Sequence, residues 1–378
     1  MRQHVTDPSR RETGHEGHRS IRFMPSMRSA YIERFEGGPD YTTYYANEEY
    51  LDPSLVNPTL YRRTSRKAFL RTIWRGDYDV LALPEPWWIV ETPYTTLLAA
   101  TARVRTLFRR RRPAIVTYAI DNAVPEVLLG LPGWMPVWLR RLGLSIFSLP
   151  YVLLLDRMAF GTEGAEKNYL GGLMLGLGRN LGKKSRTFLP LSPACDCPNV
   201  EKDPNAVLFL GLLEVRKGFD TLLKAWPGVL ERLPSARLIV CGTGPLQADL
   251  DAAMSAMPSI EQVAGASRPR IHELLRESSV LVSFPRTLWR WREQIGLSLP
   301  EGISHGCHIV TTRQTGIADW LEEVGQSVIE PDAPIEAFID AIVSAIEQPH
   351  PVPLADLPEV SGRASAEWWM AGKVDTNV

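Results

Sequence analysis

The second half of the chain alternates short apolar segments with amphipathic segments, and this alternation most constrains what the chain can fold into. The apolar runs have strand character, and most are followed by a segment with the periodicity of a helix. Regular strand–helix alternation predicts a parallel, doubly wound α/β sheet. The predicted strands cover residues 206–210, 236–241, 260–263, 280–284, 308–312 and 327–329, and the predicted helices cover 217–232, 268–276, 297–306 and 335–346.

The first half is less regular but contains the same kinds of element. Residues 31–61 are rich in Tyr, Pro and Asn and predict loop structure, and Thr162 predicts the N-cap of a helix that begins at Glu163. The predicted strands cover 21–24, 79–83, 114–118, 157–160 and 187–189, and another predicted helix covers 65–74.

Proline usage divides the chain. The stretch 190–204 contains four prolines and no periodicity, which predicts an interdomain linker. A length of 378 residues is enough for two domains with separate cores. The resulting organisation is a disordered tail at 1–20, a first domain at 21–190, a linker at 191–204, a second domain at 205–350, and a segment at 351–378 that is expected to return to the first domain.

Charge and cysteine usage exclude several classes of protein. A net charge of −1 argues against a nucleic-acid binder, and the absence of an apolar leader or of a purely apolar run of about 18 residues argues against a secreted or membrane-spanning chain. Cys195 and Cys197 are too close for a common disulfide, and no Cys/His group has zinc-ligand spacing. Cys241 and Cys307 adjoin apolar strands, as buried thiols do, so a reducing cytoplasm is expected.

Two carboxylates, Glu293 and Glu301, stand eight positions apart around a turn glycine, Gly296, shortly after the apolar run 280–284. The carboxyl end of a strand beside a helix N-terminus is where open α/β sheets bind phosphorylated ligands. We therefore expect the chemistry of the chain at this segment. The simpler alternative is two solvated acids at a helix start, where acids are favoured in any case.

Five motifs follow one another through the second half, and their order and spacing resemble the donor-binding domain of the family 4 retaining glycosyltransferases. The resemblance covers about residues 205–345 and implies the GT-B fold, an α/β architecture of two Rossmann-like doubly wound domains that face each other across a cleft. The motifs are Gly211 with Lys217-Gly218, Gly242-Thr-Gly-Pro245, Glu293-x7-Glu301 with Gly296, Gly306 before Ile309-Val310, and Thr315-Gly-Ile-Ala-Asp319.

The resemblance implies transfer of a sugar from a nucleotide-diphosphate sugar to an acceptor, with retention and without a cofactor or metal. It places Glu293 near the sugar and Lys217 on the diphosphate as catalytic residues, and Glu301 on the nucleotide ribose. Transfer builds negative charge on the leaving diphosphate, which cations and backbone N–H groups stabilise. The remaining residues of the implied donor site are Gly211, Arg216, Gly242, Gly244, Gly296, Leu297, Thr315 and Gly316.

One departure concerns the phosphate site. The family commonly has an arginine directly after the glycine that ends the first strand of this domain, whereas this chain has Leu212. Arg216 or Arg292 is expected to supply the missing charge, because a guanidinium makes forked contacts with phosphate oxygens. Leu212 also keeps open a different function, that of a catalytically weak or inactive binding or scaffold subunit. A sugar phosphorylase of the same architecture is the other alternative.

Other candidates have equally simple alternatives. Asp121 and Asn122 follow a predicted strand, and Glu163 follows another, so all three are acceptor-side candidates at the cleft; each fits a capping role as well. The glycine turns at 242–245 and 315–316 fit plain turns as well as donor contacts.

The stretch 133–155 is unusually apolar and contains Trp134, Trp138 and an arginine pair. Such a segment fits a peripheral contact with a membrane interface or a helix buried under the sheet of the first domain. Pro136 and Pro150 are expected to confine the helix to the residues between them. A membrane contact would suit a lipid-linked rather than a free glycan acceptor, and it would place the chain at the inner face of the membrane.

Overall fold

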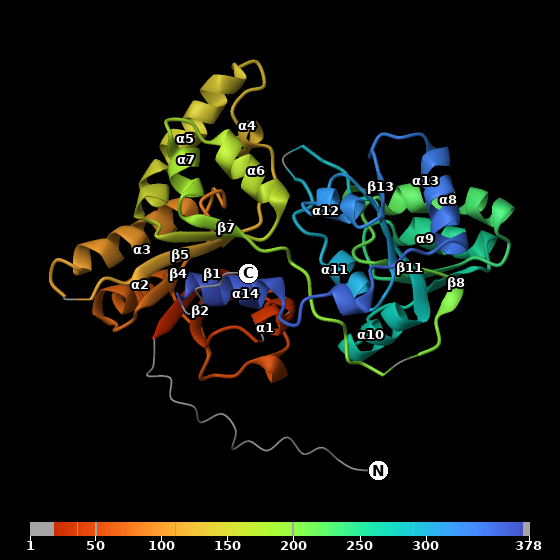
Figure 1. Ribbon diagram of the computed structural model, residues 1–378, viewed down its shortest axis with the longest axis horizontal. Helices are drawn as coiled ribbons and strands as arrows, with labels where there is room; N and C mark the ends of the chain where they lie inside the picture. The colour runs from red at the N-terminus through yellow and green to blue at the C-terminus, as the bar shows by residue number, and fades with distance from the viewer. Residues whose placement is uncertain are drawn as a thin grey trace, which may run out of the picture.

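The computed structural model describes residues 19–372 except 36, 50, 110, 199 and 290. The predicted disordered tail over 1–20 lies almost wholly outside the described residues. Two α/β domains lie next to each other, the first coloured red to yellow-green and the second green to blue (Figure 1). Each domain is built on one parallel sheet, as the strand–helix alternation predicts.

The first sheet has seven strands in the order β3-β2-β1-β4-β5-β6-β7, and every neighbouring pair is parallel. The second sheet has six strands in the order β10-β9-β8-β11-β12-β13, also all parallel. In both sheets the chain starts near the middle, moves to one edge and then returns to build the other half. This reversal creates a switch point at β1/β4 in the first sheet and at β8/β11 in the second, where α/β sheets bind ligands.

The strands of the first sheet are β1 Ser20–Met27, β2 Tyr41–Glu48, β3 Tyr61–Arg63, β4 Val80–Ala82, β5 Ala114–Ala119, β6 Arg157–Phe160 and β7 Ser185–Thr187. Those of the second are β8 Asp203–Leu210, β9 Arg237–Cys241, β10 Ile260–Gln262, β11 Ser278–Ser283, β12 His308–Thr312 and β13 Ser327–Ile329. The helices are α1 Ser29–Phe35, α2 Arg66–Arg75, α3 Thr92–Arg105, α4 Pro125–Leu128, α5 Val137–Leu154, α6 Glu163–Gly172, α7 Leu177–Gly182, α8 Phe219–Arg232, α9 Gln247–Ala256, α10 Arg268–Glu277, α11 Ser298–Ser304, α12 Ala318–Glu323, α13 Ile335–Glu347 and α14 Gly362–Met370.

Helices cover both faces of the second sheet, so its strands are buried on both sides. On one face α8 and α13 contribute Trp226 and Ile342 to a buried cluster, and on the other face α10, α11 and α12 contribute Leu275, Ile303 and Leu321. A fully buried side chain of this size stabilises the fold by about 1.5–3 kcal/mol. The near-continuous apolar runs of these strands are the sequence signature of such double coverage.

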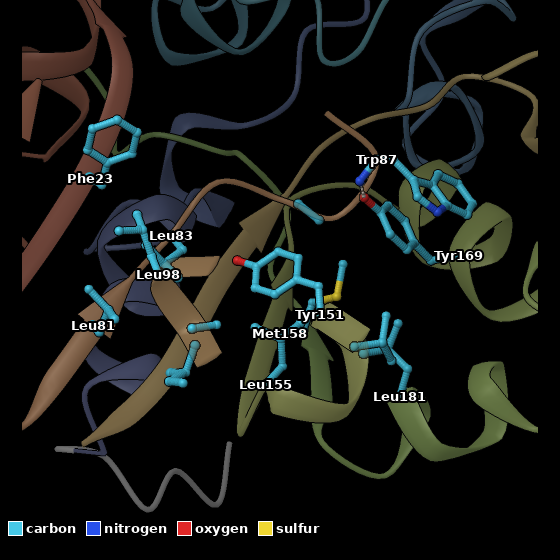
Figure 2. Packing of buried hydrophobic residues seen from close by; sticks show 14 of the residues in the cluster. Phe23, Leu81, Leu83, Trp87, Leu98, Tyr151, Leu155, Met158, Tyr169 and Leu181 are labelled. Carbon is cyan, nitrogen blue, oxygen red and sulfur yellow. Dashed lines mark hydrogen bonds between the residues drawn. The ribbon is translucent and has the colours of Figure 1, made fainter. Parts of the chain in front are cut away.

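An aromatic pair supports the loop that follows β5 in the first domain. The rings of Trp87 and Tyr169 stack with centroids 3.7 Å apart, and the backbone N–H of Trp87 donates to the Tyr169 hydroxyl at 3.0 Å (Figure 2). That hydroxyl donates to Glu85 Oε2 at 3.0 Å, and the Glu85 carboxyl accepts the N–H groups of Ile120 and Asp121 at 3.3 and 3.1 Å. Burial, followed by the charge of Asp121, raises the pKa of Glu85 to about 8. The chain is thereby held firmly where β5 points toward the second domain.

Two expectations for the first domain are wrong. Residues 31–61 were expected to form a loop, but they contain most of α1, all of β2 and the start of β3. In β2, buried and half-buried residues alternate as they do along a strand with one buried face. Helix α5 also continues through Pro150 to Leu154. Pro150 is exposed, so the carbonyl that its missing N–H leaves unpaired can face water on the outer side of the helix.

The last helix, α14, packs against the first domain rather than the second (Figure 1). Its buried Glu367 lies 2.6 Å from Arg22 Nη2 of β1 and also pairs with Arg363. At the start of α14 the Gly362 N–H donates to the Leu191 carbonyl at 2.9 Å. The segment that returns from the second domain therefore contacts the linker that leaves the first.

Candidate active site

A cavity of about 510 Å³ opens at the switch point of the second sheet. The segments that follow β8 and β11 form most of its wall, and Arg28, Tyr31 and Ile120 of the first domain line it as well. It therefore lies between the domains, at the carboxyl ends of the strands. The predicted site residues that line it are Gly211, Arg216, Lys217, Glu293, Gly296, Leu297 and Glu301.

Lys217 and Glu293, the two predicted catalytic residues, form an ion pair with each other. Both side chains are largely buried, with 21% and 11% of their surface exposed. The lysine ends a short 3-10 turn, and Gly218 follows it with φ +69°. A Cβ at Gly218 would lie 1.9 Å from the Phe284 carbonyl, so only glycine allows the chain after β8 to pass this close to the chain after β11.

The first domain holds the backbone of Glu293. Asn122 is 1% exposed, and its side-chain amide donates to the Glu293 carbonyl at 3.2 Å. Asn168 of α6 in turn donates to the Asn122 carbonyl at 3.1 Å. Asn122 was predicted as an acceptor-side residue, and the structure places it as a link between the domains directly behind Glu293.

Glu301 and Arg268 face each other at the other end of the cavity. The arginine opens α10 and the glutamate lies in the first turn of α11. The two guanidinium nitrogens lie 3.4 and 3.3 Å from the two carboxylate oxygens, which is a forked arrangement. Arg268 thus orients the carboxylate for which the family resemblance implies a ribose contact.

Among the described residues, four cationic side chains and two acidic ones line the cavity, an excess of two positive charges in the lining; Arg28 also pairs with Glu49, which lies outside it. Sequence reasoning found Arg216 and Lys217 but missed Arg28 and Arg268. The predicted first strand ended at residue 24, whereas β1 continues to Met27. Had the full length of β1 been predicted, Arg28 would have been recognised as a residue at the carboxyl edge of the sheet. Arg216 pairs with Glu214, and its guanidinium carbon lies 4.5 Å from the centre of the Trp291 ring.

Leu212, which replaces the family arginine, and Arg292, which was expected to be able to compensate for it, lie in different cavities. Leu212 lines the cavity and is 47% exposed, so no charge stands at that position. Arg292, expected to be able to compensate, lines a second cavity of about 240 Å³ between the domains instead. There it donates to the Arg313 carbonyl at 3.3 Å, and burial lowers its pKa. The expectation for Arg292 is therefore corrected, whereas Arg216 does face the main cavity.

Gly242 and Gly244 lie behind the cavity wall. A Cβ at Gly242 would be 1.8 Å from the Gly211 carbonyl oxygen, and one at Gly244 would be 2.7 Å from the Leu213 nitrogen. The two glycines therefore allow the loops after β8 and β9 to pack directly on each other. Their predicted contact with a donor stays a prediction.

Thr315 and Gly316 line the second cavity and fix the segment next to Glu293. The Thr315 hydroxyl donates to the Ile295 carbonyl at 2.7 Å, and the Gly316 N–H donates to the Gln294 carbonyl at 3.0 Å. The Gly164 N–H of the first domain donates to the Gly316 carbonyl at 3.4 Å. These hydrogen bonds connect the segment after Glu293 to the loop after β12 and to the first domain.

Within the described part of the chain, Asp121 and Glu163 stand outside the lining of both cavities. Asp121 Oδ1 accepts the Ala123 N–H at 2.8 Å, which is a local turn contact. Glu163 opens α6, where burial and then the charges of nearby acids raise its pKa. A smaller cavity of about 120 Å³ in the first domain shares Tyr31 and Ile120 with the main cavity.

Comparison with known proteins agrees with this architecture. Residues 204–348 match the family model described as "Glycosyl transferases group 1". No curated protein sequence matches the chain. Similar solved structures include the lipopolysaccharide outer core galactosyltransferase WaaB (10% identity, 94% of this chain and 97% of that one, TM-score 0.58) and Anabaena Alr3699/HepE in complex with UDP and glucose (10%, 94% and 95%, 0.57).

WaaG, a glycosyltransferase involved in lipopolysaccharide biosynthesis, is similar at 15% identity over 94% of this chain and 96% of that one, with a TM-score of 0.55. The chain spans 51% of the length of TarM, where the TM-score is 0.49. Two parallel-sheet α/β domains with these neighbours define the GT-B fold. The second domain, which supplies most of the main cavity, is the part that matches the group 1 glycosyltransferase model.

Proposed function

We propose that the chain transfers a sugar from a nucleotide-diphosphate sugar to an acceptor, with retention of the anomeric configuration. One observation carries the proposal: the Lys217–Glu293 pair lies in a cation-rich cavity at the switch point of a domain that matches the group 1 glycosyltransferases. A cavity with excess positive charge suits a diphosphate. A carboxylate within the same cavity suits the positive charge that grows on the sugar ring.

Each wall of the cavity has a part in this reaction. Lys217 and Arg216 stabilise the charge that develops on the leaving diphosphate, and Arg28 adds a cation from the opposite domain. Glu301, oriented by Arg268, accepts hydrogen bonds from the two ribose hydroxyls with its two oxygens. The positive charges are in place before the reaction, so little reorganisation is needed at the transition state.

The ion pair explains how a donor would engage the site. Without a donor, Lys217 and Glu293 neutralise each other in a poorly solvated place. A diphosphate competes for the lysine and leaves the carboxylate to the sugar. Asn122 keeps the Glu293 backbone in place during this exchange, because its hydrogen bond is to the main-chain carbonyl and not to the carboxylate.

We take UDP as the first probe. The similar structure of HepE is described as a complex with UDP and glucose, and a similar E. coli structure (TM-score 0.55) is described as bound with UDP-2-fluoro glucose. Isothermal titration calorimetry should show UDP binding to the parent and a loss of about 1.5–3 kcal/mol in binding free energy, roughly 10- to 150-fold in affinity, in Lys217→Met. Lys224→Met is the matched control, since Lys224 is an exposed lysine of α8. Glu293→Gln should keep UDP binding and lose transfer from a UDP-sugar.

Two outcomes would count against the proposal. If UDP, ADP and GDP all fail to bind the parent, the cavity is not a nucleotide-diphosphate site. If Lys217→Met and Lys224→Met bind UDP equally well, the lysine is not at the diphosphate. Retention is tested separately, by the anomeric signal of the glycoside product in proton NMR; an inverted product refutes that part alone.

The scaffold alternative rests on Leu212, which leaves one wall of the cavity apolar. Arg28 and Arg268 supply cations from other directions, which favours the enzyme. A parent that binds UDP but transfers no sugar from any UDP-sugar to water or to an acceptor would establish the scaffold. A sugar phosphorylase would instead form sugar 1-phosphate from a glycoside when inorganic phosphate is added.

We place the acceptor on the side of the first domain. The smaller cavity is lined by Tyr31, Trp88 and Glu85, and it shares the lining residues Tyr31 and Ile120 with the main cavity. Aromatic rings and carboxyl groups are the surfaces on which sugar rings stack and form hydrogen bonds. Trp88→Ala should therefore raise the KM for the acceptor while the affinity for UDP stays unchanged.

The acceptor is proposed to be presented by a membrane surface. Within the described residues, α5 is the one helix that is long and apolar enough to cross a membrane by length and composition. Leu144, Tyr151 and Val152 of α5 are nevertheless buried in the core of the first domain. We therefore place α5 along the membrane surface and not through it, with Trp134 and Trp138, which are 83% and 57% exposed, toward the lipid.

Flotation with anionic liposomes tests this surface. The parent should float with the liposomes, and a Trp134→Ser/Trp138→Ser variant should remain in the dense fraction. Trp289→Ser is the control, because Trp289 is 85% exposed but belongs to the second domain. If the double variant and the control float equally, the membrane proposal is refuted. That result would not bear on the proposed donor site.

A further inference from the structure

Two thiols and two imidazoles converge where the linker reaches the second domain. Cys195 and Cys197 belong to the linker, His272 to α10, and His305 directly follows α11. One ligand atom from each residue lies within 4.8 Å of the other three. Cys195 Sγ is 3.4 Å from His272 Nδ1, and that nitrogen is 2.9 Å from His305 Nε2.

These separations are close to the edges of a metal-binding tetrahedron. With zinc–nitrogen bonds of about 2.0 Å and zinc–sulfur bonds of about 2.3 Å, neighbouring ligand atoms lie about 3.3 Å apart for two nitrogens and about 3.5 Å apart for nitrogen and sulfur. The two edges given above differ from these values by a few tenths of an ångström, and the remaining edges are no longer than 4.8 Å. A contraction on the order of 1 Å or less along those remaining edges would therefore bring the four atoms to the spacing of a zinc site.

The surroundings already orient the ligand atoms. His305 is 1% exposed, and its Nδ1 lies 2.6 Å from the Glu301 carbonyl. That contact places the proton on Nδ1 and turns the lone pair of Nε2 toward the cluster. Arg276 Nε donates to Cys197 Sγ at 3.2 Å, and the Cys195 N–H donates to the Ser304 carbonyl at 2.9 Å. Such contacts fix the directions of metal ligands in known sites.

We propose that Cys195, Cys197, His272 and His305 bind one Zn²⁺ ion. Two sulfurs and two imidazole nitrogens in tetrahedral array form a donor set that selects zinc. Four protein ligands leave no open position, so the site is structural and takes no part in catalysis. The proposal goes beyond glycosyl transfer and does not depend on it. It differs from the sequence expectation, which found no Cys/His group with zinc-ligand spacing because it considered only spacing along the chain.

The site would fasten the linker to the helices that line the main cavity. His272 lies on α10, which carries Arg268, and His305 follows α11, which carries Glu301. Zinc would join both helices to the linker at Cys195 and Cys197. The linker beyond this point would then move with the second domain.

Metal analysis of the full chain, purified without a chelator, tests the proposal. We expect about one zinc ion per chain by inductively coupled plasma mass spectrometry. Cys195→Ala/Cys197→Ala and His272→Ala should contain none. Cys241→Ala and His350→Ala, which remove a cysteine and a histidine elsewhere in the second domain, should keep the full content. Zinc retained in the ligand variants would overturn the assignment.

Cobalt substitution of the parent protects the test against variants that fail to fold. After zinc is stripped with a chelator, added Co²⁺ should give the visible bands of a tetrahedral ion together with thiolate-to-cobalt charge transfer. A parent purified without zinc and showing neither band refutes the site. A mass two hydrogens below that of the reduced chain, from a Cys195–Cys197 disulfide in freshly purified protein, refutes it as well. Removal of zinc should also lower the melting temperature of the parent.

Discussion

Replacing Glu367 with alanine is expected to destabilise the chain by about 3–5 kcal/mol. The Glu367 carboxylate of α14 is shared by two arginines, Arg22 and Arg363, and its side chain is only 2% exposed. Burial opposes its charge, but the two arginines outweigh burial and hold the pKa of Glu367 below its ordinary value. Alanine would leave two guanidinium groups without a counter-charge where water hardly reaches.

Urea unfolding, followed by tryptophan fluorescence and circular dichroism, measures this loss. The matched control is Asp340→Ala, because Asp340 and its partner Arg232 are 64% and 47% exposed and such a surface pair contributes about 0–1 kcal/mol. Hydrogen exchange should show that α14 loses protection first in Glu367→Ala. If the two variants unfold within about 1 kcal/mol of each other, the buried pair does not hold α14 and the reasoning is refuted.

The pH dependence provides an independent check of the same group. Because the folded pKa of Glu367 is depressed, its contribution to stability is present above the ordinary value of 4.5 and is lost as the pH falls through the folded pKa. A Glu367→Gln variant resembles the protonated parent. The difference in unfolding free energy between parent and Glu367→Gln should therefore shrink as the pH falls below 4.5. A difference that stays constant down to acid pH contradicts the depressed pKa.

Three further predictions concern the site and its support. Leu212→Arg should tighten UDP binding by about 1.5–3 kcal/mol in calorimetry, because it returns a cation to the cavity wall; unchanged affinity argues that this wall does not meet the diphosphate. Glu85→Gln should flatten the pH dependence of stability between pH 4.5 and pH 8. Because the folded pKa of Glu85 is raised to about 8, the stabilising contribution of its protonated form is complete below pH 4.5 and is lost as the pH rises through 8. Urea midpoints that change in parallel with pH in parent and variant would contradict this. Gly316→Ala should cost about 1–3 kcal/mol and weaken UDP binding, since its Cβ would lie 2.2 Å from the Gln294 carbonyl; Gly133→Ala, with open space around it, is the control, and equal midpoints for the two variants are the contrary result.

The sequence predicted the second domain more completely than the first, for a physical reason. Strands buried on both faces leave continuous apolar runs, so β12, for example, is found with its bounds. Strand β2 is rich in Tyr and Thr, which favour strands, but the glycines, prolines and asparagines around it give the stretch 31–61 as a whole the composition of a loop. Only its alternating burial, which depends on the neighbouring strands, identifies it as part of a sheet.

The same division applies to the site. Lys217, Glu293 and Glu301 were predicted together because the motifs that carry the family resemblance lie within one domain, and the structure places all three in the lining of one cavity. Arg28 was missed, and the contact of Asn122 with the Glu293 carbonyl was not foreseen, because both residues belong to the other domain. The orientation of one domain against the other depends on contacts between residues more than a hundred positions apart, which leave no local pattern.

The hydrogen bond between Gly362 and Leu191 has a consequence for motion. The chain passes between the domains twice, and this contact holds the two passages together at one place. Two domains connected by two adjacent chain segments can rotate about the point where those segments meet more readily than they can move apart. The junction is therefore placed as a hinge between the domains. The hydrogen bonds of Asn122 with the Glu293 carbonyl and of Gly164 with Gly316 oppose rotation about it. Rotation about this junction would change the separation between Arg28 of the first domain and the second-domain wall of the cavity.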